Sequence, residues 1–127
     1  MNSDGAASYR SFEEFWPFYV SQHRYHATRV LHFVGTTLGF LFLALAAETG
    51  LLRYILSGIV CAYGLAWIGH FFIEKNRPAT FRYPLWSLLG DMKMYALMWR
   101  GHMTAEAERL GYPQPAPTET AAGHPAS

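Results

Sequence analysis

The chain has 127 residues, enough for one domain, and 51% of them are hydrophobic and 17% aromatic. Its ten lysines and arginines nearly balance nine aspartates and glutamates, which argues against a nucleic-acid partner, because phosphate binding needs a concentrated basic surface. The single cysteine, Cys61, cannot form an intramolecular disulfide, and its apolar neighbours indicate a small packing residue.

The N-terminal part predicts one short helix. Residues 1–10 are small and polar, and we expect them to be disordered. Ser11-Phe-Glu-Glu14 has the spacing of a capping box, and apolar residues then recur with the helical period over residues 12–22. Pro17 should bend this helix or limit its regularity. Its aromatic face suits either the membrane interface or packing against the rest of the chain.

Two long apolar segments follow, at residues 30–47 and 51–73, with a turn between them at Gly50. The first contains no charged residue and the second only Arg53, which lies near its edge. Because about 20 helical residues span the hydrocarbon core of a bilayer, the pair predicts a transmembrane helical hairpin. A soluble bundle with very apolar helices is the alternative.

The basic residues predict the orientation of this hairpin. Of the ten, only Arg53 lies at the turn, and the others lie on the side of the two termini. By the positive-inside rule both termini should be cytoplasmic, in a membrane of the bacterial inner-membrane or endoplasmic-reticulum type. The first 29 residues lack the apolar core of a cleavable signal peptide, so insertion would depend on the hairpin.

A second amphipathic helix is expected at residues 85–100, where Asp91 and Lys93 argue against a third crossing. Residues 111–127 are rich in proline and alanine and should be disordered, and His124 there is expected to be incidental. The predicted fold is therefore an all-α integral membrane protein with one domain at residues 11–103. That domain is a two-pass transmembrane helical hairpin flanked by amphipathic interfacial helices.

Three histidines should meet at one end of this hairpin. His32 lies sixteen residues before the turn and His70 twenty residues after it, or about 24 Å and about 30 Å of helix, so their depths agree within about one turn. His23 precedes the first helix, where a short bend would bring it to the same level. Glu74 follows His70 by four residues, on the same helix face. Polar groups inside a membrane are costly and usually functional, so this set predicts a metal site.

Several kinds of site remain open at this point. Imidazole and carboxylate ligands suit iron, zinc or manganese, and a set that leaves coordination positions open is the arrangement of non-haem Fe(II) oxygenases. His32 and His70 could instead hold a haem axially. The histidines could also lock the hairpin by hydrogen bonds in a non-catalytic membrane protein. The sequence has no phosphate-binding glycine loop and no nucleophile elbow.

Three motifs resemble a known family. They are His23 with Arg29-x-x-His32-Phe-x-Gly35, then Trp67-Ile-Gly-His70-x-x-x-Glu74-Lys-Asn-Arg-Pro78-Ala79-Thr80, and then Phe81-x-Tyr83-Pro84-x-Trp86-Ser87-Leu88-x-Gly90-Asp91. The first two are similar to motifs of the small membrane family that includes the fungal 2-hydroxy fatty acid dioxygenase. The third looks like its short, bacterial-type branch. The resemblance covers about residues 12–100, and this chain is shorter than the eukaryotic enzymes, which carry additional membrane segments.

The resemblance implies an Fe(II)-dependent α-oxidation of a 2-hydroxy fatty acid or a related lipid. In that reaction O2 cleaves the chain next to its carboxylate and leaves an acid one carbon shorter. Carried over to this chain, the metal ligands would be His23, His32 and His70. Glu74 matches the family's acidic residue and would be a fourth ligand or would orient an imidazole. His26 is a weak candidate, since the motif does not require a histidine there.

The resemblance also bears on the substrate. A 2-hydroxy acid can chelate Fe(II) through its hydroxyl and carboxylate, with its acyl chain lying along the hairpin. We expect Arg24, Arg29 or Arg77 to hold the carboxylate in a charge-assisted pair.

Overall fold

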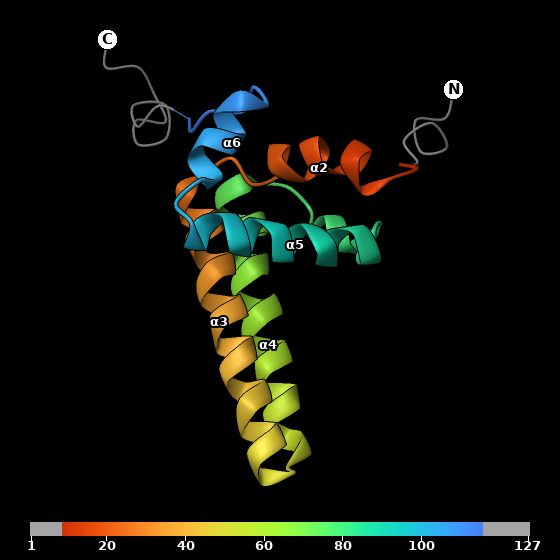
Figure 1. The fold of residues 1–127 in the computed structure, drawn as a ribbon, viewed down its shortest axis with the longest axis vertical. Coiled ribbons are helices and arrows are strands. Elements are labelled where there is room, and N and C mark those ends of the chain that lie inside the picture. Colours follow the sequence, from red (N-terminus) through yellow and green to blue (C-terminus); the bar gives the residue numbers. More distant parts are fainter. Residues whose placement is uncertain (1–8, 116–127) are drawn as a thin grey trace.

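The fold is all-helical in the computed structural model, which describes residues 9–115 (Figure 1). That range contains five α-helices, a π-helical and a 3₁₀ segment, and no strands. The predicted all-α class is therefore confirmed. Residues 1–8 and 116–127, which hold His124 and most of the two segments expected to be disordered, lie outside the described residues.

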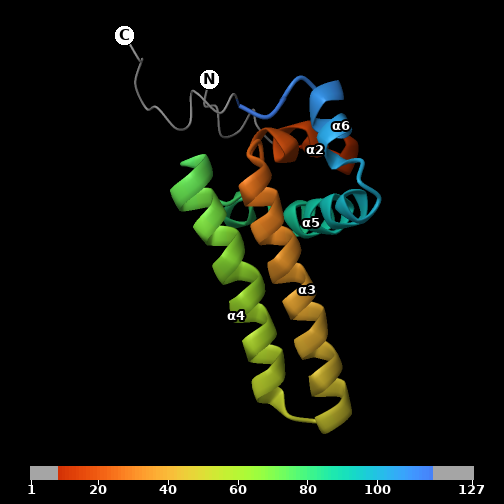
Figure 2. The same cartoon turned by 90° about the vertical axis from the view of Figure 1, so that its left-hand side faces the viewer.

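Helices α3 (His26–Thr49) and α4 (Leu52–Ile68) form an antiparallel hairpin, the long arm in Figures 1 and 2. α4 continues without a break as the π-helix η1 (Gly69–Glu74). Gly50 ends α3 with a φ of 73°, a left-handed conformation that favours glycine. Close packing holds the arm together, because a Cβ on Gly35 would lie only 3.1 Å from the Ala62 carbonyl oxygen. The two long helices predicted around residues 30–47 and 51–73 are both present.

The surface of this arm is largely apolar. Leu41 is 57% exposed, Leu52 66%, Val60 68% and Phe72 70%. In each of the two long helices, only 17% of the most apolar 18-residue stretch is buried. The core helix of a soluble protein is mostly buried instead. By length and composition both helices could cross a membrane, which points to a membrane location.

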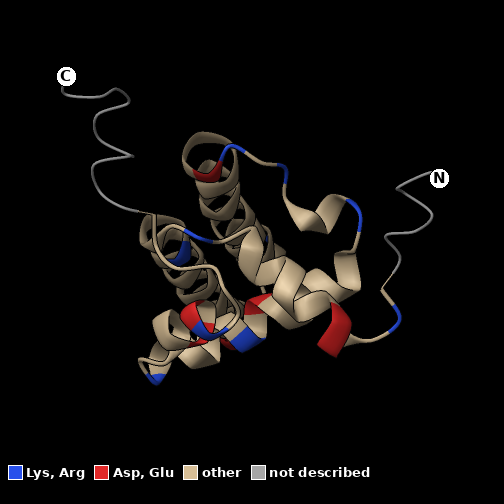
Figure 3. Cartoon of the chain, turned by 90° about the horizontal axis from the view of Figure 1, so that it is seen from above, with Lys and Arg blue, Asp and Glu red and all other residues tan. Residues whose placement is uncertain are grey.

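A helical cap covers the end of the arm away from the turn. It consists of α2 (Phe12–Ser21), α5 (Pro84–Trp99) and α6 (Met103–Arg109), with the 3₁₀ segment η2 (Ala79–Phe81) before α5. Figure 1 shows α2 and α5 running across the direction of the arm rather than extending it. Seen from above, many of the charged segments lie on these helices and on the loops around them (Figure 3).

The aromatic face of α2 packs against protein. Phe15, Trp16, Tyr19 and Val20 are buried, and they form a core cluster with Met94 of α5 and with α6. On its other side α5 packs on α3, where Tyr95 and Thr37 share a hydrogen bond of 2.8 Å between their hydroxyls. Of the two predicted environments for this aromatic face, the structure therefore has packing against the rest of the chain and not the membrane interface.

The start of α2 follows the predicted capping box only in part. The Ser11 hydroxyl accepts from the Glu14 backbone N–H at 3.2 Å, as expected. The Glu14 carboxylate instead accepts from the backbone N–H of Arg10 at 3.1 Å, one residue before the cap. The helix is continuous through Pro17.

Helix α6 was not predicted. It closes the cap through Glu106, whose carboxylate accepts from the Trp16 indole N–H at 2.7 Å and from the Arg109 guanidinium at 2.7 Å. Hydrogen bonding to Arg109, supported by Trp16, lowers the pKa of Glu106 to about 2. Helix α6 is short and has few apolar residues, so its sequence shows little helical periodicity.

Candidate metal centre

His23, His32 and His70 meet where the arm joins the cap. They come from three elements: the loop after α2, the second turn of α3, and η1. Their exposed fractions are 1%, 6% and 3%. The ring centroids lie 4.5 Å (His23–His32), 4.5 Å (His23–His70) and 5.1 Å (His32–His70) apart. One potential ligand atom from each lies within 4.8 Å of the others, so the predicted convergence of the three side chains is confirmed.

The local backbone brings η1 against α3. A Cβ on Gly69 would lie 2.8 Å from the Thr28 side chain, so only glycine allows this approach without a shift. His70 follows Gly69, and His32 lies one turn after Thr28. π-helical turns are rare and are frequently found at functional sites, which agrees with the position of His70 in η1.

Backbone carbonyls fix the tautomers of two imidazoles. His23 Nδ1 lies 2.7 Å from the Tyr19 carbonyl oxygen, and His32 Nδ1 lies 3.1 Å from that of Thr28. A carbonyl can only accept, so Nδ1 carries the proton in both rings. Each Nε2 therefore has a free lone pair.

Asn76 fixes the third imidazole in the same way. Its Nδ2 donates to the Gln22 carbonyl oxygen at 3.2 Å, which turns Oδ1 toward His70 Nδ1 at 2.8 Å. His70 Nδ1 is then the donor, and its Nε2 is also unprotonated. An acceptor behind each imidazole is the usual arrangement of metal-binding histidines.

The three histidines form a cluster able to hold a metal ion, and the spacing of one pair already suits a single small cation. Nε2 of His23 lies 3.1 Å from Nε2 of His32, with no proton between them in these tautomers. Burial, and next the neighbouring His32 and His70, lower the pKa of His23 well below its ordinary value, so its ring is neutral. Two nitrogens bound to one ion at about 2.0–2.1 Å each would lie about 3.0–3.4 Å apart, which agrees with this spacing.

The same spacing disfavours a haem. Axial ligands lie on opposite faces of a haem and are separated by the macrocycle. The His32 and His70 rings are only 5.1 Å apart between centroids, and His23 contacts both.

Glu74 lies beside the triad but is not part of it. Its Oε2 accepts from the Tyr25 backbone N–H at 2.7 Å, where it caps the start of α3. The described cluster of potential ligands contains only the three histidines. His26 is exposed at the start of α3, where its backbone N–H donates to Gln114 Oε1 at 2.6 Å, and it does not join the cluster.

The three arginines predicted to bind a carboxylate do not line the cavity beside the triad. Arg29 is 1% exposed, and it donates to the carbonyl oxygens of His23 at 2.7 Å and of Arg24 at 3.2 Å. The side chain of Arg24 is exposed, and so is that of Arg77, which lies over the Phe81 ring. The predicted role of these residues has no counterpart in the described cavity.

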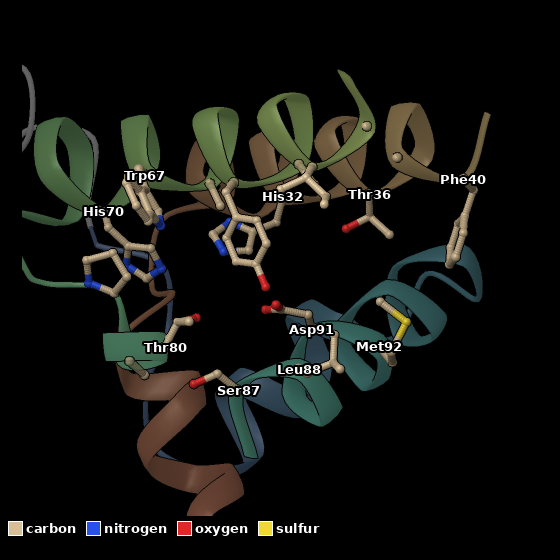
Figure 4. Close-up of a pocket in the computed structure, with 18 of the residues that line it drawn as sticks. His32, Thr36, Phe40, Trp67, His70, Thr80, Ser87, Leu88, Asp91 and Met92 are labelled. Atoms are coloured by element: carbon tan, nitrogen blue, oxygen red, sulfur yellow. The ribbon is translucent and has the colours of Figure 1, made fainter. Parts of the chain in front are cut away.

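An apolar cavity of about 250 Å³ opens from the triad along the arm (Figure 4). α3 and α4 form one wall, and α5 and η2 the other. At the triad end the wall includes the polar residues Thr80, Ser87 and Asp91 (Figure 4). Tyr19, which stacks on His23 at 4.1 Å between ring centroids, donates to Asp91 Oδ1 at 2.5 Å. Burial raises the pKa of Asp91 to about 6.

Asn76, Ser87 and Asp91 were not predicted as site residues. Ser87 and Asp91 belong to the third family motif, but the motif assigns neither of them a role, and Asp91 otherwise served only to exclude a third crossing. Asn76 lies within the second family motif, but its spacing does not distinguish it from the other polar residues of that loop.

The fold and the cluster together define an all-helical protein with two membrane-length helices and a buried three-histidine set able to hold a metal ion. A family model described as "2-hydroxy-palmitic acid dioxygenase Mpo1-like" matches residues 9–103. The chain belongs to this Mpo1-like family. Neither the curated proteins nor the solved structures contain a match to it.

Replacing Asn76 with alanine should weaken metal binding by about 10- to 100-fold, because His70 loses the acceptor that orients its ring. Asn76→Asp keeps an acceptor for Nδ1 and should stay close to wild type. Titration of the purified protein with Fe(II) or Zn(II) measures both affinities. Equal affinities for Asn76→Ala and wild type would contradict this role.

Proposed function

We propose that the protein is a membrane-embedded, Fe(II)-dependent dioxygenase that shortens a 2-hydroxy fatty acid, or a related lipid, by one carbon. The observation that carries the proposal is the convergence of three buried imidazoles, each with an acceptor behind its Nδ1 and its Nε2 unprotonated. Membership of a family described by 2-hydroxy-palmitic acid dioxygenase supports the reaction and the substrate class.

In this proposal His23, His32 and His70 hold the iron and leave coordination positions open, which suits a non-haem oxygenase. When bound, Fe(II) supplies the redox centre at which O2 reacts. The protein keeps the three imidazoles neutral, oriented and shielded from water by their burial. One O2 accepts the four electrons released when C2 becomes the new carboxyl carbon and C1 leaves as carbon dioxide.

The cavity would place the substrate. Its apolar length lies along α3 and α4 and suits an acyl chain, while its polar end adjoins the triad and suits the acid head. A substrate held this way presents C1 and C2 to the histidines and keeps its chain among apolar side chains.

Two charged residues would act by positioning the ligands. Arg29 binds the carbonyls of the loop that carries His23, and Glu74 ties the end of η1 to the start of α3. The hydrogen bonds of both residues stabilise the junction of the segments that contribute the histidines.

We further propose that α3 and α4 with η1 cross the membrane, with both termini on the cytoplasmic side. All basic residues except Arg53 lie on the side of the cap, which supports this orientation through the positive-inside rule. The triad would then lie near the cytoplasmic interface, where a fatty acid head is found.

Turnover tests the proposal. Detergent-purified protein loaded with Fe(II) should consume O2 in the presence of 2-hydroxypalmitate and release the fifteen-carbon acid, detected by mass spectrometry. Palmitate, which lacks the hydroxyl, is the matched control substrate. An iron-loaded, folded protein that leaves 2-hydroxypalmitate unchanged would contradict the proposed function.

A further inference from the structure

Ser87 carries a buried hydroxyl without a partner. The residue is 2% exposed, and its Oγ forms no hydrogen bond within residues 9–115. A serine within a helix commonly bonds back to the carbonyl four residues earlier, as Ser57 does to Arg53 at 2.9 Å. Burying a hydroxyl unpaired is unfavourable, so its presence here points to a ligand that supplies the missing partner.

This hydroxyl points into the cavity. Figure 4 shows Ser87 and Asp91 projecting from α5 toward the wall that carries His32 and His70. Spacing of four residues places both side chains on one face of α5. The Tyr19 hydroxyl donates a hydrogen bond to Oδ1 of Asp91, and no hydrogen bond to Oδ2 is found among the described residues.

The pair matches the head of a 2-hydroxy acid. A carboxylate needs donors and a hydroxyl needs an acceptor, and Ser87 and Asp91 offer one of each on adjacent turns. The described lining of the cavity contains no lysine or arginine, so the acid would not be held by an ion pair to a side chain.

We propose that Ser87 and Asp91 recognise the head of the substrate: the Ser87 hydroxyl donates to the carboxylate, and Asp91 accepts from the 2-hydroxyl. This inference rests on the proposed function and assigns its substrate selectivity to α5. Asp91 then distinguishes hydroxylated from plain fatty acids, and Ser87 binds either kind of acid.

Equilibrium binding under anaerobic conditions tests the inference, since the Fe(II)-loaded full chain cannot turn over without O2. The probes are radiolabelled 2-hydroxypalmitate and palmitate. Ser87→Ala should bind both acids about ten- to a hundredfold more weakly, the effect of losing a hydrogen bond to a charged group. Asp91→Asn, which keeps an oxygen for Tyr19, should lower the preference for 2-hydroxypalmitate over palmitate about tenfold or more.

Thermal stability and metal content separate this role from a structural one. Ser87→Ala should keep its iron and melt at the wild-type temperature or above it, because an unpaired buried hydroxyl is removed. Ser57→Ala, whose hydroxyl lies outside the cavity, is the matched control and should bind as wild type does. Weaker binding of both acids by Ser87→Ala, with a melting temperature no lower than that of wild type, supports the inference.

The possible failures are distinguishable. If wild type prefers 2-hydroxypalmitate and both variants bind as wild type does, the inference is wrong and the dioxygenase proposal stands. If iron-loaded wild type binds neither acid, both are wrong.

Discussion

Replacing His32 with alanine is expected to abolish stoichiometric metal binding. The variant removes one of three converging Nε2 atoms, and its effect should exceed the roughly 100-fold upper loss for a residue that only orients a ligand. Wild-type protein should melt at a higher temperature once metal is added, because binding to the folded state alone stabilises it by about 2.7 kcal/mol at a hundredfold excess over Kd. His32→Ala should show no such rise.

Without metal, His32→Ala should lose less stability than a usual large-to-small core substitution, which costs about 2–5 kcal/mol. In the wild-type protein two lone pairs face each other at 3.1 Å, and the substitution relieves this contact. His26→Ala is the matched control, since His26 is exposed and lies outside the cluster. A His32→Ala variant that binds one metal ion per chain with wild-type affinity would refute the assignment of this ligand.

Gly90→Ala should destabilise the protein by about 1–3 kcal/mol, the usual range for overpacking. A Cβ at this position would lie 2.6 Å from the Tyr19 ring, which is 1% exposed and cannot move freely. Because Tyr19 stacks on His23, we also expect weaker metal binding.

The same substitution at Gly64 should have the opposite effect on stability. No other part of the described chain lies within 4 Å of a Cβ there, and the residue lies within α4. Alanine should therefore stabilise this helix by about 0.5–1 kcal/mol. Differential scanning fluorimetry in detergent compares both variants with wild type. A Gly90→Ala variant that melts as wild type does would contradict the described packing of α5 on α2.

The hairpin and the triad could be predicted because each depends on simple geometry. Uninterrupted apolar length indicated two long helices, and similar distances from the turn placed His32 and His70 within about one helical turn of the same depth. The loop before α3 is short, so His23 could not lie far from them.

The surroundings of the triad could not be predicted, because they depend on backbone irregularity. An α-helix would place Glu74 on the same face as His70, but η1 is a π-helix, whose wider turns break this spacing. Lys75 then adopts a φ of 61°, and the backbone N–H of Asn76 folds back to the His70 carbonyl oxygen at 2.9 Å. Asn76 therefore takes the place beside His70, and Glu74 turns to Tyr25.

Contacts between distant segments were also beyond sequence reasoning. Tyr19 and Asp91 are 72 residues apart, and no local period relates them. Ser87 lies in the third family motif, but nothing in the sequence gives its hydroxyl a role until the cavity beside it is known.

X-ray absorption spectroscopy of the anaerobic, Fe(II)-loaded protein tests the central claim most directly. We predict one iron per chain with three imidazole nitrogens among its direct ligands. Iron bound without imidazole ligands, or a folded protein that takes up no metal, would contradict the account.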